Sequence, residues 1–216
     1  MAPFADVIPD SDALYALYRR PHDAIVRKKR QGIDAGSAAY IGLSPFVLIG
    51  AAGADGGLDV SPRGGDPGFV RVHRTDDADY VLIPDLNGNN LLDTLQAIVA
   101  TGHAGLLFLV PGHDETVRLN GAAWVVTDAD VLDRFDELRR PKAAIAVRAD
   151  EVFVHCAKAF RRSRLWQPES WEALADAPGI ETIVCAQGLF GDVDPALIRA
   201  DLEASYVRDL ALDRPE

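Results

Sequence analysis

Short apolar segments separated by turn residues fill the middle of the chain and predict β-strands. From Pro45 onward, Val, Leu, Ile and Phe gather in short runs bounded by Gly, Pro, Asp or Asn. Most connections are too short for crossover helices, which favours antiparallel pairing. The pattern predicts a mainly β fold, a mostly antiparallel barrel with flanking helices. The expected strands are residues 46–51, 58–61, 69–72, 79–83, 105–110, 116–126 and 142–156.

Apolar residues at helical spacing predict helices at both ends of the chain and one inside the barrel. Residues 32–42 are small and polar enough to predict a loop. The expected helices are residues 11–30 with an interruption at Pro21, 91–101, 128–138 and one that begins at Asp194-Pro195.

These patterns divide the chain into an N-terminal helical segment (1–44), a barrel (45–168) and an acidic helical C-terminal segment (169–216). The whole chain has 216 residues, 48% apolar, and a net charge of −11. Residues 169–216 hold 11 acids and 3 bases, a net charge of −8, so only −3 remains for residues 1–168. We expect the acidic segment to pack on the barrel or on a partner chain.

The charge and the apolar runs argue against several classes of partner. Nucleic acids and anionic membranes require a basic surface. The strongest apolar runs, residues 46–52 and 104–110, have seven residues each and are too short to cross a membrane. The N-terminus lacks a secretory pattern, so we expect a cytoplasmic protein. Cys156 and Cys185 have neither metal-ligand nor disulfide spacing, so no metal site is expected.

The segment from Tyr80 to Thr101 carries the strongest candidate for a binding site. A strand, an Asn-Gly turn and a helix start follow one another, which leaves free N–H groups of the first helical turn beside Asn89 and Asn90. Such a helix start binds anions. Ser61 and Arg63 stand at an earlier strand end, where the guanidinium can hold a phosphate through paired hydrogen bonds. We expect the two loops to meet on one phosphate.

Each part of this candidate site also has a simpler interpretation. Asn87-Gly88 is a common hairpin signal, although the helical spacing that follows favours a helix start. An Asn at a helix start is often only a cap. Arg63 and Asp66 would, taken alone, suit a surface ion pair.

A basic and aromatic stretch follows the last expected strand. Four bases and Trp166 occur between residues 158 and 166, which is unusual in an acidic protein. The simple interpretation is a solvated basic helix with a packed Trp, and the alternative is a site for a planar, anionic ligand. His155 is expected to be structural, since no second metal ligand lies at a suitable spacing.

Together these motifs resemble the pyridoxamine 5'-phosphate oxidase-like superfamily of FMN-binding split β-barrels over residues 40–168. The shared motifs are the Ser61–Asp66 turn, Gly88-Asn89, and the His155–Lys158 stretch with Leu165-Trp166. Within the superfamily the chain is similar to a subgroup of FMN-dependent enzymes of unknown substrate. The resemblance implies a homodimer with two FMN molecules at the interface, each touched by both chains.

The resemblance also implies three groups of cofactor contacts. The phosphate group is Ser61, Arg63, Asn89 and Asn90. The ring group consists of Ile83 and Pro84, whose backbone lines the isoalloxazine, and of Thr116, placed at a polar contact to the flavin with Arg118 two residues on. The group that reaches the site from the other chain is Lys158, Arg164 and Trp166.

Two departures from the oxidase itself bear on the substrate. The oxidase has basic residues at the helix start, whereas this chain has Asn89-Asn90-Leu91, so its phosphate binding would rest on Arg63 and backbone amides. The oxidase's C-terminal basic motif is replaced by an acidic segment. Both departures argue against vitamin B6 oxidation.

The resemblance therefore implies an FMN-dependent oxidoreductase that transfers a hydride between flavin N5 and a small organic substrate. The alternative is a non-enzymatic protein of the same fold that holds FMN, a flavin-like cofactor or haem for sensing or storage. A hydrolase built on Asp66, His73 and Asp114-Glu115 is disfavoured, because these residues lack a nucleophile elbow and metal spacing. The sequence identifies no catalytic residue, substrate or electron partner.

Overall fold

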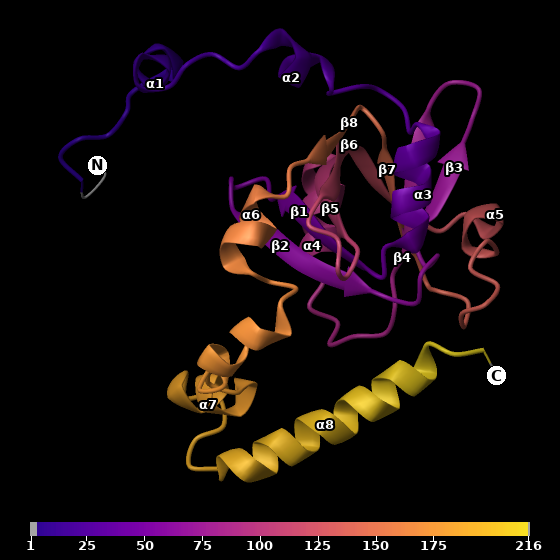
Figure 1. The fold of residues 1–216 in the computed structure, drawn as a ribbon. Helices are drawn as coiled ribbons and strands as arrows, with labels where there is room; N and C mark the ends of the chain where they lie inside the picture. Colours follow the sequence, from indigo (N-terminus) through magenta and orange to yellow (C-terminus); the bar gives the residue numbers. More distant parts are fainter. Residues whose placement is uncertain (1–3, 216) are drawn as a thin grey trace.

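The computed structural model describes residues 4–215 and shows a β-barrel with helices outside it and at both chain ends (Figure 1). Each strand pairing is antiparallel, in the order β2-β1-β5-β6-β7-β4-β3, and β8 pairs with β6. The predicted antiparallel split barrel is confirmed. The strands are β1 (Phe46–Ala52), β2 (Leu58–Gly64), β3 (Arg71–Arg74), β4 (Asp79–Pro84), β5 (His103–Leu109), β6 (Thr116–Val126), β7 (Ala144–Arg148) and β8 (Glu151–His155).

Strand β6 belongs to both halves of the barrel. Its residues 117–122 pair with β5 and residues 116–120 pair with β8, whereas residues 123–126 pair with β7. The change of partner occurs around Gly121, where a Cβ would overlap the carbonyl oxygen of Arg148. Glycine therefore permits the close crossing at which the barrel divides into two sheets.

Side chains alternate along the strands, so every second residue enters the core. Val47 and Ile49 of β1 and Leu106 and Phe108 of β5 are buried on the inner face of the sheet. Ile98 of α4 (Asp93–Thr101) packs against the same core. Burial of each such side chain contributes about 1.5–3 kcal/mol. The opposite face of β1, β2 and β5 is left open to a ligand or a partner.

The remaining helices surround the barrel or lie at the ends of the chain. No helix among residues 4–215 has the length and apolar character needed to cross a membrane. These helices are α1 (Ser11–Leu17), α2 (Asp23–Arg27), α3 (Ala35–Leu43), α5 (Ala129–Leu132), α6 (Lys158–Ser163), the 3-10 turns Pro168–Ser170 and Glu172–Leu174, α7 (Ile180–Ala186) and α8 (Pro195–Leu212).

The prediction of a loop at residues 32–42 is wrong, because most of this segment forms α3. Asp34 caps the helix: its carboxylate accepts hydrogen bonds from the backbone N–H and the hydroxyl of Ser37. Ile33 and Ile41 are buried against the barrel. The cap and these two anchors stabilise a helix that small residues alone did not indicate.

The prediction of one strand over residues 142–156 is also wrong. The segment forms β7 and β8, separated by Ala149 and Asp150. The Asp150 carboxylate accepts from the Ala122 N–H at 3.0 Å and from Arg148. This corner sends β7 to one half of β6 and β8 to the other. The expected helix at 128–138 is likewise shortened to the four residues of α5.

Candidate functional site

β2 and α4, the strand and the helix at which phosphate binding was predicted, lie side by side. Thr94 in the first turn of α4 donates a short hydrogen bond to the Asp59 carboxylate on β2, and Ser61 donates to the same oxygen at 2.9 Å. Arg63 lies on the same face of β2, because alternate strand residues share a face. β2 extends to Gly64, so Ser61 and Arg63 lie within the strand rather than at its end.

Arg63 is half-buried, and its Nη1 donates to the Pro62 carbonyl at 2.9 Å. Burial raises the pKa of Asp85, which follows β4, and the nearby charges of Arg63 and Lys142 oppose that rise. No ion pair joins Arg63 to Asp66 within the described residues. Arg63 and Lys142 thus form a cationic surface at the end of β4.

The prediction that Asn89 and Asn90 begin the helix is wrong, since α4 begins at Asp93. Asn89 Oδ1 accepts from the Leu91 N–H at 3.0 Å, and Asn90 adopts a left-handed backbone with a φ of 58°. Both features belong to a turn and delay the helix. Leu92 at the N-cap makes no side-chain cap bond, and the N–H groups of residues 88–90 donate to no other described residue. The loop therefore retains free donors.

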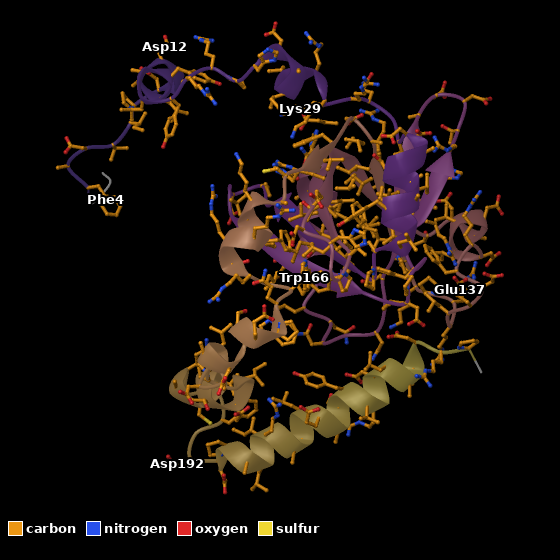
Figure 2. All side chains as sticks on the ribbon, viewed as in Figure 1. Phe4, Asp12, Lys29, Glu137, Trp166 and Asp192 are labelled. Atoms are coloured by element: carbon orange, nitrogen blue, oxygen red, sulfur yellow. The ribbon has the colours of Figure 1, made fainter. Side chains whose placement is uncertain are left out.

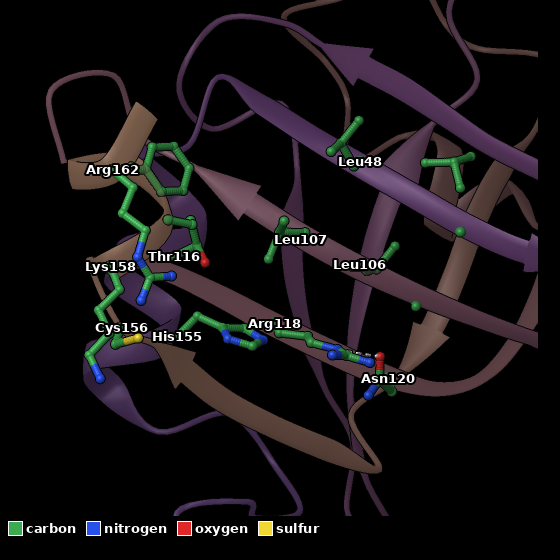
Figure 3. A pocket seen from close by; sticks show the side chains of 15 residues that line it. Leu48, Leu106, Leu107, Thr116, Arg118, Asn120, His155, Cys156, Lys158 and Arg162 are labelled. Carbon is green, nitrogen blue, oxygen red and sulfur yellow. Dashed lines mark hydrogen bonds between the residues drawn. The ribbon is translucent and has the colours of Figure 1, made fainter. Parts of the chain in front are cut away.

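A pocket of about 590 Å³ lies on the opposite face of the sheet (Figure 3). Its floor is apolar and includes Leu48 of β1, Val60 of β2 and Leu107 of β5. The predicted ring residues Thr116 and Arg118 reach it from β6, and predicted Lys158 lines it from α6, together with Arg162 and His155. Figure 3 shows these polar side chains along one side of the apolar floor.

The pocket's polar side is cationic. Arg118, Lys158 and Arg162 line it, and none of the described lining residues is acidic. Burial, followed by the charge of Arg118, lowers the pKa of His155 and so favours the neutral imidazole. The Lys158 N–H lowers the pKa of the exposed Cys156 thiol. An apolar floor beside cations suits a planar ligand that carries negative charge.

Trp166 and Arg164 lie outside the pocket lining. The Trp166 indole N–H donates to the His113 carbonyl at 2.8 Å, and its ring stacks on Phe160 with centroids 5.7 Å apart. These contacts, with the Arg161–Asp114 ion pair at 3.0 Å, hold α6 against the loop between β5 and β6. Arg164 ends α6 with a left-handed φ of 52°. Trp166 thus positions the helix that carries Lys158.

The side chains of Ile83 and Pro84 are buried, and Ile83 is 0% exposed. Only the backbone of this strand end is available to a ligand. The sequence interpretation missed two nearby cations, Lys142 and Arg162. Arg162 lies in the basic stretch after β8, so the sequence offered a signal for it. Lys142 lies in no recognisable motif, and its position depends on how the chain enters β7.

The sheet separates the predicted site residues into two groups. Ser61 and Arg63 face α4, and Asn89 and Asn90 lie in the loop before it. Thr116, Arg118 and Lys158 face the pocket on the other side. One chain therefore does not bring the two groups together.

Comparison with known proteins identifies a family. Residues 34–156 match the family described as "Pyridoxamine 5'-phosphate oxidase", which is more than half of the chain. No curated protein matches.

Among solved structures, the chain is similar to HupZ from Group A Streptococcus, with 16% identity and a TM-score of 0.45 over 56% of this chain and 93% of that one. It is similar to HutZ, described as a haem storage protein from Vibrio cholerae, with 9% identity and a TM-score of 0.38 over 57% and 94% of the two chains. It is also similar to an FMN-binding protein from Syntrophomonas wolfei, with 9% identity and a TM-score of 0.40 over 67% of this chain and 92% of that one. All three TM-scores are below 0.5, so these likenesses add no weight to the family match.

Proposed function

The chain belongs to the pyridoxamine 5'-phosphate oxidase family, and from this premise we propose that it binds FMN between the two chains of a homodimer and acts as a flavin oxidoreductase. The observation that carries the proposal is that Arg63 lies on the face of β2 that packs against α4, whose start has no side-chain cap. A guanidinium and free backbone N–H groups are the donors that a phosphate requires.

The phosphate group of FMN would be held by Arg63 together with the free N–H groups of residues 88–90. Lys142 adds a second positive charge, whereas Asp85 opposes the phosphate when it is ionised. Phosphate binding therefore depends on Arg63 more strongly than in a site with several basic residues.

The partner chain would supply the rest of the site. The apolar floor with Leu48, Val60 and Leu107 is open in a single chain, which suits a face that pairs with a second copy. Such pairing would bring the Arg118 and Lys158 of one chain toward the FMN held by the Arg63 of the other. The separation of the two groups by the sheet supports this composite arrangement.

Bound FMN supplies hydride transfer at N5, and the chain supplies binding, orientation and charge. Arg118 and Lys158 would stabilise negative charge on a reduced ring. The floor would exclude water from the face where a small organic substrate lies.

The alternative is a protein of the same fold that holds a cofactor without turnover. His155 favours haem in this case, because a half-buried, neutral imidazole at an apolar pocket suits iron ligation.

Absorption spectra test the proposal. Addition of FMN to the purified protein should give a flavin spectrum that remains with the protein after gel filtration and bleaches with dithionite. Turnover of reduced nicotinamide or a flavin-linked dye should follow if the protein is an enzyme. A protein that retains FMN without turnover supports the binding alternative, and one that retains haem but no FMN overturns the proposal.

A further inference from the structure

The basic stretch after β8 contains four bases, and the structure directs them to different places. Arg161 pairs with Asp114 at 3.0 Å, and Arg164 ends α6, so neither arginine lines the pocket. Lys158 and Arg162 do line it. They are four residues apart, a spacing that places two side chains on one face of a helix. α6 therefore directs two cations into the same cavity.

These two cations have no acidic partner within the described residues. Neither Lys158 nor Arg162 forms an ion pair with any residue between 4 and 215, and no acid among those residues lines the pocket. Like charges at this spacing repel each other and slightly destabilise a helix. An anion bound between the two side chains would remove this repulsion.

The helix that carries the two cations is held in place. Trp166 lies between α6 and the barrel (Figure 2), where its indole N–H donates to the His113 carbonyl and its ring stacks on Phe160. Side chains on a fixed helix lose less conformational freedom when they bind a ligand. The two cations are thus preorganised for binding.

The positive charge available to a ligand is concentrated at one end of the pocket. Figure 3 shows Lys158 and Arg162 together at that end, whereas Arg118 extends along the side. The Arg118 Nε donates to Asn120 Oδ1 at 3.3 Å, and its guanidinium lies 5.6 Å from the centre of the Phe153 ring. Arg118 is therefore partly satisfied by its own chain, and the α6 end is not.

The floor of the pocket contains two glycines side by side. Gly50 of β1 and Gly105 of β5 both line the pocket and are paired across the two strands. A glycine inside a strand often marks a place where a ligand approaches the backbone closely. Together with Leu48 and Leu107, the two glycines form an apolar surface on which a planar group can lie.

We propose that the substrate of the flavin enzyme is a small carboxylic acid with a planar, apolar body. Arg162 binds the carboxylate, Lys158 adds a second positive charge, and the body lies over Gly50 and Gly105. One guanidinium fork and one ammonium match the two oxygens of a carboxylate. The inference rests on the proposed function, because it names the substrate class of the same pocket.

Two probes of nearly the same shape test the proposal. Naphthoate carries a carboxylate, whereas the matching isomer of naphthamide is neutral. Equilibrium dialysis of the FMN-loaded protein at neutral pH measures the affinity of each probe, and the visible flavin spectrum reports whether a bound probe lies near the ring. Naphthoate should bind about ten- to a hundredfold more tightly than naphthamide and should shift the flavin bands.

Arg162→Gln should remove most of this preference. Naphthoate should bind this variant about tenfold less tightly, while the affinity for naphthamide should not change. Arg162→Lys should keep part of the preference, because it retains the charge. The matched control is Arg134→Gln, which lies after α5, is exposed and has no ion pair within residues 4–215; it should change neither affinity.

Equal affinities for the two probes, or an unchanged preference in Arg162→Gln, would overturn the proposal. So would naphthoate that fails to bind the FMN-loaded protein, or that binds and leaves the flavin bands unchanged. A protein that does not retain FMN would overturn the proposed function and the substrate role together. Dialysis of that same protein would still decide whether the pocket binds a carboxylate through Arg162, so the two failures are distinguishable.

Discussion

Arg63 is the residue on which the account of phosphate binding depends. It is half-buried, lies on the α4 side of β2, and is near enough to Asp85 to lower the pKa of that carboxyl against the effect of burial. A guanidinium in this place can bind a phosphate in bidentate fashion, which Lys142, as a point charge, cannot do. The two cations should therefore contribute unequally.

Arg63→Ala should weaken FMN binding ten- to a hundredfold, which corresponds to the loss of about 1.5–3 kcal/mol from a hydrogen bond to a charged group. Arg63→Lys should lose less, because it retains the charge. A fluorescence titration of FMN measures both. Arg140→Ala, which removes a solvent-exposed pair with Asp133, is the matched control and should bind FMN normally. An unchanged affinity in Arg63→Ala would disprove the phosphate assignment.

Site residues that lie in a local sequence motif could be predicted from the sequence. Site residues that only the tertiary fold brings near the site could not. Thr116, Arg118 and Lys158 were expected near a ligand and do line the pocket. Lys142 was not expected, because it has no motif of its own and approaches Asp85 only through the tertiary fold. The contacts of Thr116, Arg118 and Lys158 with FMN remain predictions.

At the scale of elements, the strands were easier to predict than the connections between them. β6 was expected at residues 116–126 and lies there. The break between β7 and β8 was missed, since it depends on the Asp150 carboxylate reaching the Ala122 N–H on another strand. α3 was missed because the Asp34 cap and the buried side chains stabilise the helix, although the small, polar composition of the segment indicated a loop.

Gly121→Ala should destabilise the barrel, because the new Cβ would overlap the Arg148 carbonyl oxygen, which belongs to the backbone and cannot turn aside. We expect a cost of about 1–3 kcal/mol or more, as for other overpacked sites. Urea unfolding measures the change. The control is Gly42→Ala in α3, where a Cβ meets nothing within 4 Å. Equal stabilities of the two variants would contradict the crossing described for β6.

Asp34→Ala should destabilise the protein by about 1 kcal/mol at pH 7 through loss of the α3 cap. The Ser37 N–H, and then its hydroxyl, lower the pKa of Asp34 in the folded state. The stabilisation is therefore present above the usual carboxyl pKa of 3.8 and is lost as the pH falls through the lower folded value. Asp34→Asn should retain most of the cap without this acid dependence. The free energy of unfolding, measured from pH 3 to 7, tests this prediction. Equal pH dependence of the wild type and Asp34→Asn would contradict it.

At the scale of the whole molecule, a single chain has unsatisfied surfaces at three places. The apolar pocket floor is open, α1 and α2 have no buried residue, and α8 exposes apolar side chains such as Val207. The division into segments 1–44, 45–168 and 169–216 remains a prediction.

The structure shows where the unevenly distributed charge of the sequence lies. Residues 169–215 of the acidic segment lie below the barrel (Figure 1). The sequence could not show that the sheet divides the predicted site residues between its two faces, because this depends on which side of β2 packs against α4. That division is the reason for expecting a site built from two chains.

FMN binding to a purified mixed dimer is the most direct test of this composite site. One chain carries Arg63→Ala, the other carries Arg118→Ala and Lys158→Ala, and different affinity tags allow the mixed dimer to be isolated. It should contain a single FMN site of wild-type affinity, formed by the intact Arg63 of one chain and the intact Arg118 and Lys158 of the other, while both parent homodimers bind weakly. A mixed dimer without any site of wild-type affinity would show that each chain holds its own cofactor, and would contradict the account.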